Sequence, residues 1–415
     1  KATADIPVKV YYANCVPVIH TDFSTLDPTP IGLYPDILVP KKSDAKWAEL
    51  EAYRGVKKYF EKGETTLMSA FNDCWQTLWV CVNEDGKEIA AGEHEVKLEL
   101  FDQALNKLGE NSITLTVIDK SLPEQSLIYT NWFHYDCISD FYNKEIFSDE
   151  FFKIMRDFVK KAASNGMNML LTPFFPPPLD TMVGDERKTA QLVKIKLENG
   201  KYSFDFSLLK RFMDICREDG IRYFEHSHLF TQWGAKHAPK IVAEVDGEEK
   251  RIFGWDTDAT GDEYISFLRA YLTELRAFLK AEGLEKNILF HISDEPNEDH
   301  YINYQAAYEK IADLLDGFMV GDALSHVEFF ESGLVKIPIA LTRFAHKFVG
   351  KGDNIWAYYT GAEVQNGLSN RLIQMPREHN RILGVELYHH NIKGFLHWAY
   401  NFYYGESSKG LFNPC

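Results

Sequence analysis

The chain has 415 residues, which is more than one ordinary domain needs, and 14% of them are aromatic. Its formal net charge of −16 argues against a nucleic-acid partner, because phosphate binding needs a basic surface. No apolar run is long enough to span a bilayer, so we expect no membrane insertion.

The six cysteines are scattered and form no CxxC pair. This spacing argues against a zinc ribbon and against a disulfide scaffold, and we predict neither a metal site nor a cofactor. Thiols that are mostly reduced slightly favour the cytoplasm over a secreted location. The chain begins at Lys1 rather than Met, which is compatible with a removed leader or tag. Localisation and oligomeric state therefore stay open.

The first part of the chain has the pattern of an antiparallel sheet. Apolar and polar residues alternate over 94–100 and 112–117, and Asn83 to Gly86 supplies a turn. Such alternation is typical of strands with one buried face. Residues 32–38 have the composition of a connecting loop. We predict a smaller all-β sandwich over residues 1–122, with the junction near Pro123.

From Ser126 onward strands and helices alternate, which predicts a (β/α)8 TIM barrel over residues 123–415. The main alternative is an open doubly wound sheet, but no glycine-rich loop follows the first strand. The chain ends just after the eighth strand, so we expect a barrel that lacks its last helix. The expected helices are 149–165, 208–219, 263–279, 301–315 and 376–390. The expected strands are 126–134, 167–175, 221–229, 287–293, 318–322, 337–342, 354–360 and 394–400.

The fourth strand ends in two adjacent acids, Asp294 and Glu295. Pro296 follows them and favours an extended backbone at Glu295. The carboxyl end of a barrel strand is the catalytic face, and paired acids there indicate cleavage of a glycosidic bond. Alternatively the acids cap the next helix, although Asn297 could already do so.

Other strand ends add aromatic rings, imidazoles and amides, and they lack lysine. Hydroxyl recognition and ring stacking fit this composition better than phosphate recognition, so we expect a carbohydrate substrate. The candidate substrate-binding residues at these strand ends are Trp132, His134, His228, Tyr358, Tyr359, Trp398 and Asn401.

Several of these residues have alternative interpretations. Trp398 is also compatible with ordinary barrel packing. His226 and His228 lie two apart and could ligate a metal, but no third ligand at HExxH spacing accompanies them. Tyr358 and Tyr359 alternate faces, so at most one of them should reach the cleft.

Three motifs together resemble the catalytic domain of glycoside hydrolase family 123. They are Ser293-Asp-Glu-Pro296, Asn370-Arg-Leu-Ile-Gln-Met-Pro376 with Arg381, and Gly394-Phe-Leu-His-Trp-Ala-Tyr-Asn401. The resemblance covers about 126–401, and the preceding sandwich is similar to that family's accessory domain. The chain departs from the family in having Thr360-Gly361 where a cysteine-containing stretch is usual.

The resemblance implies a barrel and a retaining β-N-acetylgalactosaminidase. It also implies substrate-assisted catalysis by Asp294 and Glu295, with Asn370 among the substrate-binding residues. Glu295 would be the general acid and then the base, while Asp294 would orient the 2-acetamido group.

The spacing of the acids supports the same mechanism independently. Retaining enzymes with two carboxylates hold them ~5–5.5 Å apart across the sugar, and inverting enzymes ~6.5–9.5 Å. Sequence neighbours cannot flank a ring from opposite faces, so the acetamido oxygen would be the nucleophile. One alternative is a two-carboxylate retaining glycosidase in which Glu363 is the nucleophile. The other is a catalytically inactive sugar-binding protein.

Overall fold

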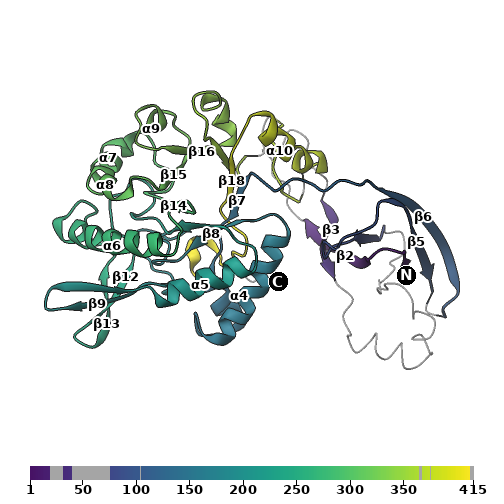
Figure 1. Ribbon diagram of the computed structural model, residues 1–415, viewed down its shortest axis with the longest axis horizontal. Helices are drawn as coiled ribbons and strands as arrows, with labels where there is room; N and C mark the ends of the chain where they lie inside the picture. The colour runs from purple at the N-terminus through teal and green to yellow at the C-terminus, as the bar shows by residue number, and fades with distance from the viewer. Residues whose placement is uncertain (19–30, 40–74, 103, 364–366, 374, 412–415) are drawn as a thin grey trace. The chain divides into compact units, whose positions relative to one another are not determined.

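The computed structural model describes residues 1–18, 31–39, 75–102, 104–363, 367–373 and 375–411 (Figure 1). The chain divides into two compact units. One comprises Lys1–Glu124 and Arg371–Arg377, and the other comprises Gln125–Asn370 and Glu378–Cys415. Within the described residues, none of the helices has both the length and the hydropathy that crossing a membrane requires.

The N-terminal unit contains two antiparallel three-stranded sheets. Their small shared core includes Val8, Val10 and Val96. The prediction of a loop at 32–38 is wrong, because this segment pairs with β2 as an edge strand. An edge strand tolerates Pro35, whose missing N–H would break the ladder of a central strand. In one sheet the strand order is β1 (Ala2–Thr3), β5 (Gly92–Phe101) and β6 (Lys107–Val117). In the other sheet it is β3 (Gly32–Val39), β2 (Val8–Val18) and β4 (Thr77–Val82).

The second unit is built on a closed barrel of eight parallel strands, which confirms the predicted fold. Each strand overlaps one of the eight strands expected from the sequence, because a strand buried on both faces has a nearly continuous apolar sequence. The order around the barrel is β11 (Tyr223–His226), β14 (Ile288–Phe290), β15 (Met319–Leu324), β16 (Ile337–Leu341), β17 (Trp356–Tyr359), β18 (Gly394–His397), β7 (Ile128–Asn131) and β8 (Met169–Thr172).

Successive residues of a barrel strand belong to two different cores. On β17, Trp356 and Tyr358 pack inside the barrel, whereas Tyr359 packs in the layer between strands and helices. The neighbouring strand begins with Gly394, where a Cβ atom would lie 2.1 Å from the Trp356 ring. The glycine therefore allows the indole to fill the barrel interior.

Helices lie outside the ring of strands, as Figure 1 shows. The helix expected over 301–315 is divided at Lys310 and Ile311 into α7 and α8. The described chain after β18 contains the short 3-10 helix η3 (Glu406–Ser408) and runs to Leu411. The α-helices are α3 (Tyr135–Tyr142), α4 (Asp149–Ser164), α5 (Ser207–Glu218), α6 (Asp262–Ala281), α7 (Tyr301–Glu309), α8 (Ala312–Leu315), α9 (Glu328–Glu331) and α10 (Arg377–His389).

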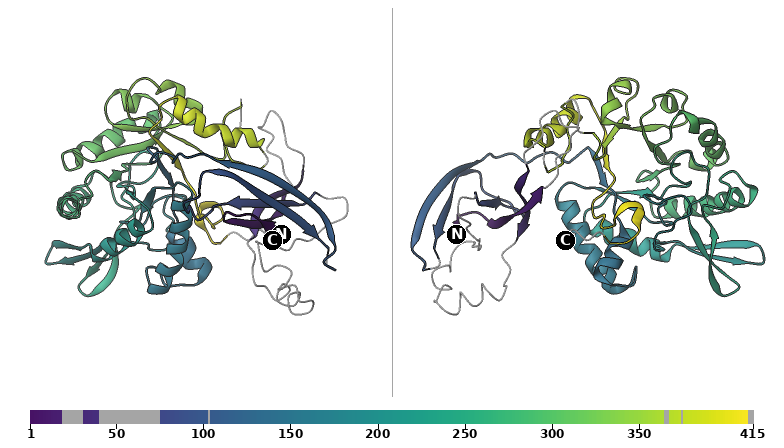
Figure 2. Two further views of the ribbon diagram at one scale, coloured as in Figure 1. Left: turned by 45° about the vertical axis from the view of Figure 1, so that its right-hand side comes forward. Right: turned by 180° about the vertical axis from the view of Figure 1, so that it is seen from behind.

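Two β-hairpins are inserted into the barrel repeat, and the sequence analysis did not predict them. They join into one four-stranded sheet, and Figure 2 shows them projecting side by side from the barrel. Their strands are β9 (Lys194–Glu198), β10 (Lys201–Asp205), β12 (Ile241–Val245) and β13 (Glu248–Phe253).

Candidate active site

A cavity of about 340 Å³ opens at the carboxyl ends of the barrel strands. Six of the predicted site residues line it, and aromatic side chains form much of its wall. Three acids are among the lining residues, which are Trp132, His134, Leu179, Asp180, Gln232, Trp233, Asp294, Glu295, Ala323, Tyr358, Thr360, Gly361, Leu396 and Trp398.

The two adjacent acids contribute to the same cavity from the tip of β14. Asp294 is half-buried and Glu295 is exposed. The expectation of an extended backbone at Glu295 is wrong, because its φ is +44°. A left-handed non-glycine residue costs roughly 1–2 kcal/mol, and such strain is concentrated at functional sites. The Tyr358 hydroxyl donates a hydrogen bond of 2.6 Å to Oε1 of Glu295 and so helps to orient this carboxyl group.

The proximity of the two acids changes their proton affinity. Burial, together with the charge of Glu295, raises the pKa of Asp294 well above its ordinary value. The physical reason is that two adjacent carboxylates repel each other in a site that water solvates poorly. The pair therefore retains a proton at a pH where an isolated aspartate would be ionised.

Hydrogen bonds from two directions fix the backbone that carries the acids. Asp322 of β15 accepts from the backbone N–H of Ile292 at 3.0 Å and of Ser293 at 3.4 Å. On the other side, the N–H of Trp233 donates to the Asp294 carbonyl at 3.0 Å. The strand tip is therefore held between β15 and the loop that follows β11.

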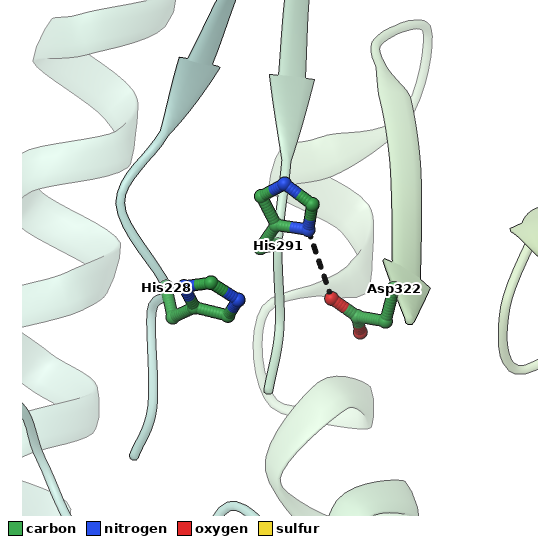
Figure 3. A group of neighbouring side chains, drawn as sticks. All are labelled: His228, His291 and Asp322. Atoms are coloured by element: carbon green, nitrogen blue, oxygen red, sulfur yellow. Dashed lines mark hydrogen bonds and ion pairs between the residues drawn. The ribbon is translucent and has the colours of Figure 1, made fainter. Parts of the chain in front are cut away.

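A buried polar chain connects Trp132 to the same strand tip. The Trp132 indole N–H donates to Glu225 at 2.8 Å, and Nε2 of His291 lies 2.9 Å from the same oxygen. Nδ1 of His291 lies 3.3 Å from Oδ1 of Asp322. Figure 3 marks this contact with a dashed line. Burial favours neutral His291, but the hydrogen bonds and charges of the two carboxylates prevail and raise the pKa of His291 to about 10.

His228 does not line the cavity but stacks on His291, with ring centroids 4.6 Å apart. Its Nδ1 atom is buried without a hydrogen-bond partner, and burial holds the pKa of His228 well below its usual range. Donor atoms of His228, His291 and Asp322 lie within 4.8 Å of one another, close enough for a metal ion. However, both nitrogens of His291 already face carboxylates, so a metal would have to displace an existing ion pair.

His134 is among the residues that line the cavity, and both of its ring nitrogens have partners. Nδ1 accepts from Arg187 at 3.0 Å, so the proton lies on Nε2, which donates to the Trp398 carbonyl at 3.1 Å. Burial and the Arg187 charge lower the pKa of His134 to about 3, which keeps the ring neutral. The Asn401 amide exchanges two hydrogen bonds with the His134 backbone. Asn401 thus positions His134 from outside the lining.

Two other predicted residues also lie outside the lining of the cavity. Tyr359 packs against Phe395, with ring centroids 5.1 Å apart. Asn370 donates to the carbonyls of Thr360 and Glu363 at 2.8 and 2.9 Å, and so fixes the loop after β17. Direct substrate contacts by these residues stay a prediction.

Glu363, the alternative nucleophile, is buried and engaged by its own loop. Its Oε2 atom accepts from the backbone N–H and from the hydroxyl of Thr360, both at 2.7 Å. Its Oε1 atom lies 3.5 Å from the Arg343 guanidinium. Both oxygens therefore have partners, and Glu363 is not among the residues that line the cavity.

The sequence pattern did not predict some of the residues at the site. Trp233, Gln232 and Asp180 come from long loops, where no periodic pattern marks the position of a side chain. Arg187, which forms a buried ion pair with Asp136 at 2.7 Å, lies on such a loop as well.

Comparisons with known proteins identify the family and support the fold. Residues 132–412 match the family model described as the catalytic domain of glycoside hydrolase 123. A solved family 123 glycoside hydrolase from Clostridium perfringens, described for glycolipid glycan hydrolysis, is similar in fold, with a TM-score of 0.68. The two share 13% sequence identity, and the similarity covers 96% of this chain and 69% of that one. No curated protein matches the chain.

Proposed function

Because the chain belongs to glycoside hydrolase family 123, we propose that it releases β-linked N-acetylgalactosamine from glycans or glycolipids with the help of the substrate's own acetamido group. The observation that carries this proposal is the pair of adjacent acids, Asp294 and Glu295, on one wall of the cavity. Neighbouring carboxyls cannot reach the sugar from opposite faces, as two-carboxylate mechanisms require.

In the proposed reaction Glu295 faces the leaving oxygen and acts as the proton donor. The acetamido carbonyl oxygen forms a bond to the anomeric carbon while the bond to the leaving oxygen breaks. Glu295 transfers its proton to that oxygen. Water then opens the cyclic intermediate, and Glu295 accepts the proton of this water. The order of steps predicts retention of anomeric configuration.

Asp294 accepts the acetamido N–H in this scheme. As the oxygen attacks, positive charge develops on the acetamido nitrogen, and a carboxylate at hydrogen-bond distance stabilises that charge. The raised proton affinity of Asp294 makes it a stronger acceptor than an ordinary aspartate. Asp294 therefore has a role that differs from proton transfer to the leaving group.

The aromatic walls suit a pyranose. Trp132 and Trp398 line the cavity beside the acids, and the exposed ring of Trp233 adds a further apolar face. Sugar rings stack their C–H faces on such surfaces, and the polar side chains of the lining supply partners for the hydroxyls.

Two observations bear on the two-carboxylate alternative. Glu363 is engaged by Thr360 and Arg343, which argues against a nucleophilic role. Asp180 lines the cavity, but its side chain accepts a hydrogen bond of 3.1 Å from Ser408. A 2-deoxy-2-fluoro glycoside that labelled either residue covalently would establish this alternative.

Release of p-nitrophenol from matched β-glycosides tests the proposal. We expect cleavage of the N-acetyl-β-galactosaminide and little cleavage of the β-galactoside, which lacks the acetamido nucleophile. Equal cleavage of both would refute the acetamido requirement. A preference for the N-acetyl-β-glucosaminide would keep the mechanism but change the sugar. Failure to cleave any of them would favour a sugar-binding protein.

A further inference from the structure

His291 lies beneath the acid pair and has no role in the proposed proton transfers. It is fully buried and belongs to the same strand tip as Asp294, three residues before it. Each ring nitrogen faces a carboxylate oxygen, at 2.9 Å from Glu225 and 3.3 Å from Asp322. An ionised carboxylate only accepts hydrogen bonds, so this geometry requires protons on both nitrogens.

The two carboxylates that face His291 also bind groups at two different places around the cavity. Glu225 accepts from the indole N–H of Trp132 and from the hydroxyl of Thr130 on β7. Asp322 accepts from the backbone of Ile292 and from the hydroxyl of Tyr304. A single buried chain of hydrogen bonds therefore runs from one aromatic wall to the backbone beneath the acids.

We infer that His291 is a positioning residue for the hydrolysis: its imidazolium, clamped between Glu225 and Asp322, fixes Trp132 relative to the strand that carries Asp294 and Glu295. The inference rests on the proposed function only in the identity of the acid pair. A neutral side chain at position 291 would leave two buried carboxylates with no cation between them. The chain of hydrogen bonds would then be broken at its centre.

The charge of this cluster also acts on the acids above it. The imidazolium lowers the proton affinity of Asp294, whereas the Asp322 carboxylate and Glu295 raise it. The ionisable groups around His291 come from four elements. They are Glu225, His226 and His228 from β11 and its loop, Asp322 from β15, Tyr304 from α7, and Asp294 from the same segment after β14. Burial keeps both His226 and His228 neutral, so the charges that act on the His291 imidazolium come from the carboxylates.

The acidic limb of the kcat/KM profile should report the ionisation of Asp294, which accepts the acetamido N–H as a carboxylate. Two substitutions should therefore shift this limb in opposite directions. His291→Gln removes a positive charge, so the limb should move to higher pH. Asp322→Asn removes a negative charge, so the limb should move to lower pH. Each should lower kcat by about 10²-fold, because a small displacement of the acids is enough for such a loss, with KM changed far less.

His226→Gln is the matched control. This histidine is also fully buried at the end of β11, but it stacks on Phe174 in the layer between strands and helices, with its Nε2 atom 2.7 Å from the Tyr271 hydroxyl. We expect a lower melting temperature with kcat and the pH profile of the folded enzyme unchanged.

The experiment measures kcat, KM and the pH profile of the full chain and of these variants, on whichever p-nitrophenyl glycoside the wild type cleaves best. If that substrate lacks the acetamido group, the proposed function is wrong, but the opposite pH shifts still decide the role of His291. An unshifted limb in His291→Gln, or parallel shifts in the two variants, would overturn the inference. If His291→Gln does not fold, an unshifted limb in Asp322→Asn alone would also overturn it.

Discussion

The two adjacent acids differ in their surroundings, and this difference suits the separate roles proposed for them. Glu295 is exposed and oriented by Tyr358, whereas Asp294 is half-buried and its pKa is raised. A general acid must reach the leaving oxygen, and the exposed position suits this role. Asp294 is better placed to accept a hydrogen bond from a substrate group that lies deeper in the cavity.

Glu295→Gln should separate substrates by their leaving groups. Hydrolysis of an alkyl or glycan leaving group should fall by about 10²–10⁴-fold, because general acid catalysis contributes that much. Activated aryl glycosides, which need little protonation, should lose much less activity in their first step. Parallel loss on both substrate types, measured as kcat/KM, would show that Glu295 is not the acid.

Trp398→Ala tests the aromatic wall of the sugar site. We expect the affinity for an N-acetylhexosamine inhibitor, measured by calorimetry, to fall by about 1–3 kcal/mol. Trp255→Ala is the control, because its indole donates to the Asp185 carbonyl and it does not line the cavity. If Trp398→Ala lowered the melting temperature with affinity unchanged, Trp398 would be a packing residue.

The loop after β11 is the element that supports both the cavity wall and the acids. Trp233, Gly234 and Ala235 all have positive φ values, between +53° and +111°. At Gly234 a Cβ atom would lie 2.7 Å from the ring of His300, which follows the acid pair. The loop and the segment after Pro296 are therefore packed too closely for any side chain at this position.

Gly234→Ala should consequently reduce both stability and turnover. Strain in the left-handed region and crowding should together cost about 2–5 kcal/mol. Gly247→Ala is the matched control, because its φ of +81° is also positive but no atom lies within 4 Å of its Cβ position. Melting temperatures and kcat report the two effects, and equal turnover in both variants would show that this loop does not support the site.

Elements with a simple pattern could be predicted from the sequence. The apolar run of β14 predicted a barrel strand, since a buried strand needs apolar side chains on both faces. The acids after it line the cavity, and their catalytic role stays a prediction. The hairpins around β9 and β13 were missed because their exposed strands are rich in charge. Glu225 and His291 are far apart in sequence, so only the closed barrel reveals their contact.

The whole molecule should respond to pH through its buried histidines. The pKa of His291 is raised to about 10, so its contribution to stability is complete below its unfolded pKa near 6.5. That contribution is lost as the pH rises from about 6.5 through 10. His134 and His226 have pKa values lowered to about 3, so their contribution is lost as the pH falls below about 6.5.

The melting temperature of the barrel should therefore fall between pH 7 and 10, and His291→Gln should flatten this alkaline slope. Thermal unfolding followed by circular dichroism at constant ionic strength measures the melting temperature at each pH. His134 and His226 do not change protonation in this window, so His226→Gln should keep the wild-type slope. The same slope in His291→Gln would contradict the charged state of His291.

Inhibition by a thiazoline derived from N-acetylgalactosamine tests whether the substrate's acetamido group is the nucleophile. This compound mimics the cyclised intermediate that Asp294 and Glu295 are proposed to stabilise, and transition-state-like ligands bind more tightly than substrates. We expect competitive inhibition with an inhibition constant at least about 10²-fold below the KM of the aryl substrate. Full activity in the presence of millimolar thiazoline would contradict substrate-assisted catalysis.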